Sequence, residues 1–355
     1  MSRSARQDGF MMPIDAASDT AEPAPTAGVR RALVTGGAGF IGSHLVEQLL
    51  QRGAAVTVVD DFSTGRQDNL AHLRPSDRLT VVEGSVGDRE LIAPLIEQSD
   101  HVYHLAAAVG VALIASRPIS TIERNVYPTE LVLAELSRQW QAGRAVKLFL
   151  ASTSEVYGKN PKERWCEEDD LVFGATTRPR WSYGASKAID EFLALAYRRE
   201  TGLPVVIGRF FNVVGPRQTG AYGMVLPRFV AAAVRNEPLI VHDDGRQERC
   251  FAHVRDVVGA VLTLMDHAQA AGRVYNIGGD QPISILELAR QVIRIAGSSS
   301  TIEFRSYARA YDDDFEDVRR RVPDLSRLRA TIGYEPQVSL EETIAELVAL
   351  ERNTS

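Results

Sequence analysis

Two side chains that could move a proton together stand four residues apart in the stretch YGASK, Tyr183 and Lys187. The surrounding segment has helical spacing, so both side chains are expected on one face of a helix. A phenol with a pKa of about 10 is a poor base at neutral pH. A neighbouring ammonium group favours the phenolate, so the pair could take a proton from a substrate hydroxyl.

A second group of reactive side chains, Thr153, Ser154 and Glu155, lies in the stretch STSEVYG. It follows the apolar run KLFLAS, which predicts a buried strand. The carboxyl ends of the strands in a parallel sheet are where such sheets bind ligands. Glu155 is therefore interpreted as a group that transfers a proton or positions a substrate, with a solvated loop charge as the alternative.

A glycine-rich turn, TGGAGFIG, places Gly36, Gly39 and Gly42 between a predicted strand and a predicted helix. Glycines permit the tight turn and the close approach of the backbone to a pyrophosphate, which the helix N-terminus attracts. Asp60 ends the next strand, where an acid can accept hydrogen bonds from both ribose hydroxyls. The pattern indicates NAD, because a carboxylate repels the 2′-phosphate of NADP, although Arg66 nearby leaves NADP open.

Strands and helices alternate through the first half of the chain. Apolar runs such as AAVTVVD, LTVVEG and HVYHLA predict buried strands, and segments with helical spacing separate them. This alternation predicts an α/β fold with a Rossmann-type doubly wound parallel sheet. From about Gly215 the elements become shorter and prolines and glycines cluster, which indicates a smaller C-terminal α/β lobe that binds the substrate.

The chain is accordingly divided into three parts. Residues 1–29 are predicted to be a disordered extension, because their Ala, Pro, Ser, Thr and Asp content cannot bury much surface. Residues 30–212 form the predicted NAD-binding domain and residues 213–355 the predicted lobe, some segments of which are expected to return to the sheet.

Composition excludes several classes of function. The formal net charge of -6 gives no electrostatic case for nucleic acid, and no apolar run approaches the length of about 18 residues that a membrane helix needs. Two cysteines are too few for a disulfide framework, so a reducing compartment, the cytoplasm, is expected. His104, His242 and His253 do not cluster with them, so no metal site is predicted.

From Arg31 to about Leu350 the chain resembles the extended short-chain dehydrogenases/reductases that act on nucleotide sugars. Besides the stretches above, HLAAAVGV, RFFNVVGPR, RCFAHVRD and YNIGG carry the resemblance. It implies an NAD-dependent enzyme that oxidises C4 of a nucleotide sugar, with uridine as the expected nucleoside. It also implies a homodimer, paired through the predicted helices at residues 121–139 and 182–199.

The resemblance further implies which residues bind. The residues expected to contact NAD are Gly36, Gly39, Phe40, Ile41, Gly42, Asp60, Ser85, Leu105, Ala106, Asn125, Tyr183 and Lys187. Ser85 is a departure, because extended members usually have an Asp there to contact adenine. The residues expected to contact the sugar nucleotide are Asn212, Arg217, Arg228, Arg249 and Arg321. For Arg217 and Arg228 an ordinary surface role is the alternative.

The residues after Thr153 distinguish the reactions that can follow the 4-ketone. Dehydratases of the family have Asp-Glu there, and Ser154 is too weak an acid to replace the Asp. Plain 4-epimerases usually carry small or uncharged groups, which leaves Glu155 unexplained. Ser-Glu is similar to the UDP-glucuronate decarboxylases, in which the 4-ketone turns the C6 carboxylate into a β-keto acid that loses CO2 once the enolate is stabilised.

FEDVRRRVPDL resembles the segment in which those decarboxylases carry a functional arginine two residues before a proline, here Arg321. Its guanidinium could contact the substrate carboxylate, although Arg319 and Arg320 leave the assignment open. Decarboxylation of UDP-glucuronate, to UDP-xylose or its 4-keto form, is the predicted function. A 4-epimerase acting on UDP-glucuronate or UDP-glucose is the second candidate, and a 4,6-dehydratase the third. A non-enzymatic dinucleotide-binding protein would be expected to have lost Tyr183 or Lys187.

Overall fold

The computed structural model describes residues 31–108, 118–220, 224–306 and 318–354. The predicted disordered extension lies outside the described residues, as do the last part of HLAAAVGV and the first part of FEDVRRRVPDL.

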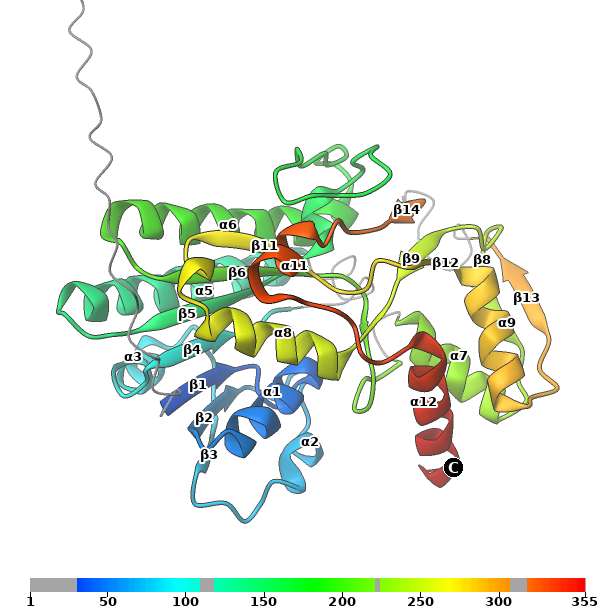
Figure 1. Ribbon diagram of the computed structural model, residues 1–355, viewed down its shortest axis with the longest axis horizontal. Coiled ribbons are helices and arrows are strands. Elements are labelled where there is room, and N and C mark those ends of the chain that lie inside the picture. Colours follow the sequence, from blue (N-terminus) through cyan, green and yellow to red (C-terminus); the bar gives the residue numbers. More distant parts are fainter. Residues whose placement is uncertain (1–30, 109–117, 221–223, 307–317, 355) are drawn as a thin grey trace, which may run out of the picture.

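A seven-stranded parallel sheet forms the centre of the fold (Figure 1). Its order is β11-β6-β5-β4-β1-β2-β3, so the direction of winding reverses between β1 and β4. In chain order its strands are β1 (Arg31–Thr35), β2 (Ala55–Asp60), β3 (Leu79–Glu83), β4 (His101–His104), β5 (Lys147–Thr153), β6 (Val205–Phe210) and β11 (Arg273–Ile277). The central strands are almost continuously apolar because helices cover both of their faces. The predicted Rossmann-type sheet is confirmed.

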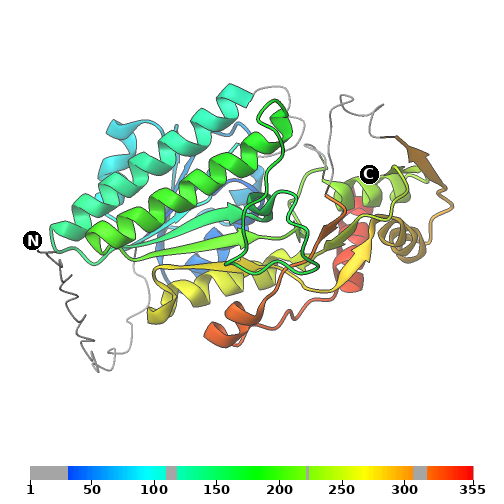
Figure 2. The same ribbon diagram turned by 90° about the horizontal axis from the view of Figure 1, so that it is seen from above.

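Helices on the two faces enclose two apolar cores. Figure 2 shows α5 and α6 side by side over one face and α8 on the opposite face. On the first face lie α3 (Arg89–Glu97), α5 (Pro118–Gln141) and α6 (Ser182–Thr201), and on the second α1 (Phe40–Gln51) and α8 (Val254–Asp266). The short α2 (Asp68–Ala71) follows β2.

Helix α6 positions the predicted proton-transfer pair. It follows a single 3-10 turn, η2 (Pro179–Trp181), whose proline has the fixed backbone that suits a helix start. It ends at Gly202, which adopts a left-handed φ of 78° and donates its backbone N–H to the Arg198 carbonyl. Its first two turns lie beside η1 (Ser154–Tyr157), the turn that follows β5, so α6 brings Tyr183 to the carboxyl end of the sheet.

The C-terminal part of the chain builds a smaller lobe with its own apolar core. Its helices are α7 (Val225–Val234), α9 (Ile285–Ala296) and α12 (Leu340–Thr354). Its strands form three small sheets, which are β7 (Val213–Val214) with β10 (Ala252–His253), β8 (Leu239–His242) with β13 (Ile302–Arg305), and β12 (Pro282–Ser284) with β9 (Glu248–Cys250) and β14 (Arg320–Arg321). Strand β11, helix α8 and helix α11 (Ser326–Ile332) come from the same part of the sequence but pack with the large sheet. The division of the chain at residue 212 stays a prediction.

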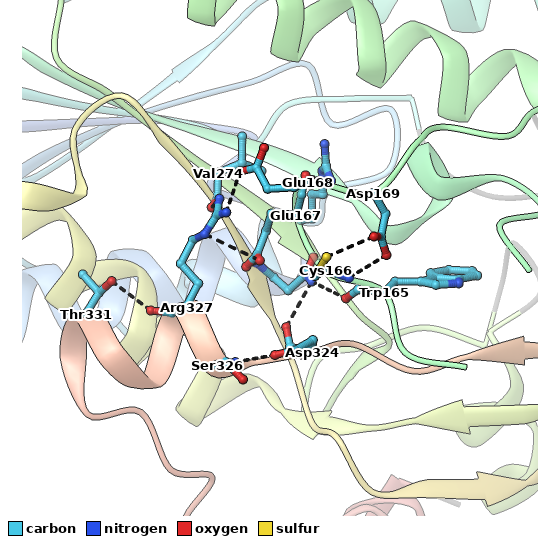
Figure 3. Close-up of polar contacts among 12 residues, drawn as sticks. Trp165, Cys166, Glu167, Glu168, Asp169, Val274, Asp324, Ser326, Arg327 and Thr331 are labelled. Atoms are coloured by element: carbon cyan, nitrogen blue, oxygen red, sulfur yellow. Dashed lines mark hydrogen bonds and ion pairs between the residues drawn. The ribbon is translucent and has the colours of Figure 1, made fainter. Parts of the chain in front are cut away.

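The long connection between η1 and α6, residues 158–178, is held against β11, the edge strand of the large sheet, and against α11. Figure 3 shows Arg327 of α11 reaching Glu167 and Glu168 of this connection and the backbone of Val274 in β11. The fully buried Asn276 of β11 accepts the Tyr157 hydroxyl at 2.7 Å. Its amide nitrogen donates to the Trp165 carbonyl at 2.8 Å and to the Asp324 carbonyl at 3.1 Å.

We predict that Asn276→Ala lowers the free energy of unfolding by about 2–4 kcal/mol, because it removes three hydrogen bonds and leaves buried polar groups without partners. Urea denaturation measures the change. The exposed Asn353 in α12 provides the control, since Asn353→Ala is expected to change stability by less than about 0.5 kcal/mol. Equal effects of the two substitutions would contradict the anchoring role of Asn276.

Candidate active site

A cavity of about 880 Å³ lies between the carboxyl ends of the sheet strands and the lobe. It opens where the winding of the sheet reverses, between β1 and β4, which is the position at which sheets of this type bind ligands. All of the predicted site residues except Asn125 line it, namely Gly36, Gly39, Phe40, Ile41, Gly42, Asp60, Ser85, Leu105, Ala106, Thr153, Ser154, Glu155, Tyr183, Lys187, Asn212, Arg217, Arg228, Arg249 and Arg321.

Asn125 lies in α5 outside the lining. Its side-chain oxygen accepts the Ala108 backbone N–H at 2.8 Å, and its amide nitrogen donates to the Ser186 hydroxyl at 3.1 Å. It therefore connects α5 to α6 and to the segment that follows β4. This contact with the protein differs from the expected contact with NAD.

The glycine-rich turn has no room for side chains. A Cβ on Gly42 would overlap the Gly36 carbonyl oxygen, and a Cβ on Gly36, where φ is +70°, would lie 2.8 Å from the Ala106 backbone nitrogen. The tight turn and its close packing against the segment after β4 therefore require glycine at both positions, as in the dinucleotide-binding turn. The residues present fit a dinucleotide at this end of the cavity.

Asp60 is held at the end of β2 by two backbone donors. One carboxylate oxygen accepts the Ala38 N–H and the other accepts the Phe62 N–H, both at 2.9 Å. Burial raises the pKa of Asp60, and these two hydrogen bonds oppose that rise. The orientation suits ribose hydroxyls, and Arg66 is turned to an ion pair with Asp68 at 3.2 Å. Asp60 and its donors therefore fit NAD better than NADP.

Tyr183 lines the cavity together with Thr153 at the end of β5. Burial raises the pKa of the Tyr183 phenol, the negative charges of Glu155 and Asp190 raise it further, and the Thr153 hydroxyl opposes this rise. Lys187, one turn further along α6, is buried and forms an ion pair with Asp190. Tyr183 and Thr153, the two groups that could act on one substrate hydroxyl, are therefore on the wall of the same cavity.

Glu155 is clamped between two arginines in a group that we call the Glu155 cluster, which is Glu155, Arg180 and Arg321. Each carboxylate oxygen accepts one guanidinium N–H at 2.6 Å, one from Arg180 and one from Arg321. Burial alone would raise the pKa of Glu155, but Arg321 and Arg180 together lower it to about 2. The carboxylate is ionised at neutral pH, which favours a positioning role over proton transfer.

The structure distinguishes the three consecutive arginines. Arg319 forms an ion pair with Asp244 and Arg320 one with Glu248, both on the outer side of the lobe. Arg321 is buried, lines the cavity, and has an Nε that makes no hydrogen bond with any described residue. The predicted choice of Arg321 among the three agrees with this placement.

Arg180 is a cavity residue that sequence reasoning missed. The connection formed by residues 159–181 is long for a compact domain, which predicts a loop that covers the substrate. In the structure it contributes Arg180 alone to the described lining of the cavity. Glu167 and Glu168 of this connection contact Arg327 of α11, and Trp165 packs against Tyr157 and Phe211. The sequence signal was the stretch PRW just before the catalytic helix.

Arg217 lines the cavity but its guanidinium also connects the lobe to the NAD end. It forms an ion pair with Glu47 of α1 and donates to His44 Nδ1 at 2.8 Å. Asn212 and Arg228 of α7 also line the cavity, and Arg249 pairs in register with Arg321 across β9 and β14. The expected substrate residues therefore surround the lobe side of one cavity.

His104 is a buried histidine with both ring nitrogens in hydrogen bonds, to Thr35 at 2.8 Å and Thr129 at 3.2 Å. Burial lowers its pKa to about 3, so it is neutral. No group of three or more potential metal ligands occurs among the described residues. In the same part of the chain no helix has the length and apolar character needed to cross a membrane.

The chain is similar to known proteins in sequence and in structure. Residues 33–347 match the protein family described as GDP-mannose 4,6 dehydratase. A UDP-N-acetyl-alpha-D-glucosaminuronate decarboxylase from Bacillus cytotoxicus is 39% identical over 320 residues, which are 90% of this chain and 97% of the relative. UDP-glucuronic acid decarboxylase 1 from Arabidopsis thaliana is 35% identical over 91% of this chain and 70% of its own. The structure of a dTDP-glucose 4,6-dehydratase from Bacillus anthracis in complex with NAD is similar with a TM-score of 0.78 and 28% identity, over 91% of this chain and 97% of the other.

The Glu155 cluster predicts how stability depends on pH. Because the pKa of Glu155 falls from 4.5 to about 2 on folding, its contribution is complete above pH 4.5 and is lost as the pH falls through about 2. Glu155→Gln is expected to lower the free energy of unfolding by about 3 kcal/mol at neutral pH and by less than half of that near about pH 3. Urea denaturation across this pH range measures both.

The control for this prediction is Glu200→Gln, which removes one carboxylate from the exposed end of α6. It is expected to leave stability within about 0.5 kcal/mol of the unchanged protein at each pH. A stability difference for Glu155→Gln that does not change with pH would show that the Glu155 carboxylate is not held ionised.

Proposed function

Since the chain belongs to the GDP-mannose 4,6 dehydratase family of extended short-chain dehydrogenases/reductases, we propose that it decarboxylates a UDP-linked hexuronate after oxidising C4 of the sugar. The protein is an enzyme and its cofactor is NAD. Both decarboxylases compared above act, by their names, on UDP-linked uronates.

The observation that carries the proposal is the pair of guanidinium groups in the Glu155 cluster. Arg180 and Arg321 both line the wall of the cavity beside Glu155. A guanidinium group binds a carboxylate through charge-assisted hydrogen bonds. The C6 carboxylate of a hexuronate can form such bonds here, whereas the C6 hydroxyl of a neutral hexose carries no charge.

The residues around β5 account for the oxidation step. NAD, when bound, supplies the acceptor for the hydride that leaves C4. Tyr183 takes the proton of the C4 hydroxyl, and the Thr153 hydroxyl holds the same oxygen by hydrogen bonding. The glycine turn and Asp60 at the far end of the cavity fix the cofactor relative to these two groups.

Carbon dioxide loss then needs little acid–base chemistry from the protein. With a ketone at C4, the electrons of the C5–C6 bond pass toward the C4 oxygen as CO2 departs. The protonated Tyr183 and Thr153 donate hydrogen bonds to the resulting enolate oxygen. C5 then takes up a proton. Arg321 and Arg180 hold the carboxylate until the bond breaks, and Glu155 keeps their guanidinium groups in place.

Dehydration fits the site less well. A 4,6-dehydration needs an acid to protonate the departing C6 hydroxyl, and Ser154 is a buried hydroxyl with no such acidity. Glu155, the next residue, is already ionised between its two arginines. The family description therefore fits this chain in fold and cofactor, while the residues at the C6 end favour a carboxylate.

The proposal is tested by incubating the enzyme and NAD with UDP-glucuronate and with UDP-N-acetylglucosaminuronate and following the sugar protons by NMR. Loss of the carboxylate, with a pentose or its 4-keto form appearing, is the expected result. Arg321→Ala and Arg180→Ala are each expected to lower kcat/KM by about a hundredfold or more, because a buried charge pair with the substrate is lost.

Arg319→Ala is the matched control, since Arg319 is in the same arginine run but pairs with Asp244 on the surface. It is expected to leave kcat/KM unchanged. Equal losses for Arg319→Ala and Arg321→Ala would contradict the carboxylate role. Conversion of UDP-glucuronate to UDP-galacturonate without loss of CO2 would instead establish a 4-epimerase.

We further propose that the enzyme is a homodimer paired through α5 and α6. The outer faces of these two adjacent helices expose large apolar side chains, including Ile122, Tyr127, Ile189 and Phe192, of which Tyr127 is 57% and Phe192 68% exposed. An apolar surface on two parallel-lying helices suits a two-fold partner that presents the same surface.

Phe192→Asp is expected to convert the dimer to a monomer, because it places a charge at the centre of that apolar surface. Sedimentation velocity measures the mass. Phe304→Asp is the control, since Phe304 is also exposed but lies on β13 in the lobe. If both variants sediment like the unchanged protein, α5 and α6 do not form the interface.

The state of the two cysteines bears on the compartment in which the protein works. Cys166 and Cys250 are free thiols. This supports a reducing environment, and we propose the cytoplasm as the location.

A further inference from the structure

Lys187 is held by an acid of its own helix. Its Nζ lies 2.6 Å from Asp190 Oδ2, and both side chains are buried, with 3% of Lys187 and none of Asp190 exposed to solvent. The two residues are three positions apart, so α6 itself presents the carboxylate to the ammonium group. Lys187 also lines the cavity, whereas Asp190 does not. The carboxylate therefore contacts the lysine from behind the site.

The surroundings of this ion pair contain few other charges. His104 of β4 faces Lys187 and is neutral, since burial and then Lys187 lower its pKa to about 3. Thr129 of α5 donates its hydroxyl to the Asn125 carbonyl at 2.8 Å, and the second carboxylate oxygen of Asp190, Oδ1, makes no hydrogen bond with any described residue. Glu191 is turned away to a two-pronged ion pair with Arg209. Toward the cavity, the charge of Glu155 in η1 also raises the pKa of Tyr183. Glu155 itself forms ion pairs with Arg180 and Arg321.

The ion pair changes what the lysine can do for the tyrosine. An isolated ammonium favours the phenolate of a nearby tyrosine, but an ammonium paired with a carboxylate has little net charge. From this arrangement, and resting on the proposed role of Tyr183 as the base, we infer that Asp190 is a positioning residue that fixes Lys187 and sets the pH range in which Tyr183 takes its proton.

The direction of the effect follows from charge. The negative charge of Asp190 raises the pKa of the Tyr183 phenol, in addition to the larger effect of burial and that of Glu155. Burial raises the pKa of Asp190 itself, Lys187 lowers it, and the charge of Glu191 raises it by a smaller amount. Removing the Asp190 charge should therefore favour the phenolate and move the activity of Tyr183 to lower pH.

The test is Asp190→Asn, which has the same shape and keeps an oxygen that can accept the Lys187 N–H. In the NAD-bound enzyme without sugar, the phenolate of Tyr183 is titrated by ultraviolet difference absorbance, with Tyr183→Phe in each background as the blank. The expected result is ionisation about one pH unit lower than in the unchanged enzyme. The acid limb of the kcat/KM profile should move by the same amount, with the KM for the sugar nucleotide little changed.

The matched control is Glu191→Gln. Glu191 is the next residue on the helix, is also buried and also pairs with a cation, but its charge is not among those that act on Tyr183. It is expected to lower stability without moving the titration. Asp190→Glu, which keeps the charge, should restore the original pH range, and Asp190→Ser serves as a second uncharged variant if Asp190→Asn does not fold.

An unmoved titration in both uncharged variants would overturn the inference, and so would an equal movement in Glu191→Gln. The phenolate titration needs no turnover. A shifted titration in an enzyme that converts no UDP-uronate would therefore support the role of Asp190 while the proposed substrate fails.

Discussion

An ionised carboxylate inside the protein, Glu155, is the constraint on which the arrangement of the site depends. Its charge is tolerated because Arg180 and Arg321 each bind one of its oxygens. The three residues come from the turn after β5, the turn before α6 and the short strand β14. Each of these segments must therefore be in place before the charge can be buried. The same contacts place two guanidinium groups at the cavity wall.

Several features of the fold serve this one arrangement. The connection between η1 and α6 runs along strand β14, where the Trp165 N–H bonds the Val322 carbonyl beside Arg321. The carbonyl of the same residue, Trp165, accepts a hydrogen bond from Asn276, and Arg327 of α11 holds the neighbouring Glu167 and Glu168. The connection formed by residues 159–181 therefore does not mainly cover the cavity. It links strand β11 of the large sheet to the segment that carries Arg321.

Local patterns in the sequence predicted local structure well. The glycine turn, Asp60, and the pair Tyr183 and Lys187 each depend on a strand, a turn or a helix of a few residues, and the structure has those elements where they were predicted. Long-range pairing could not be predicted in the same way. Glu155 and Arg321 are 166 residues apart, and a lone arginine in PRW gives no sign of its partner. The contact of Asn125 with NAD stays a prediction from the resemblance, whereas its hydrogen bonds to Ala108 and Ser186 could not be predicted from the residues around it in the sequence.

The return of β11 to the large sheet has a mechanical consequence. The chain leaves the sheet after β6, passes through the lobe, comes back for α8 and β11, and leaves again. Because several segments of the chain cross between the large sheet and the lobe, a movement of one part relative to the other must change the backbone in all of these crossings together. Opening of the cavity is therefore coupled to the positions of α8 and β11 on the large sheet.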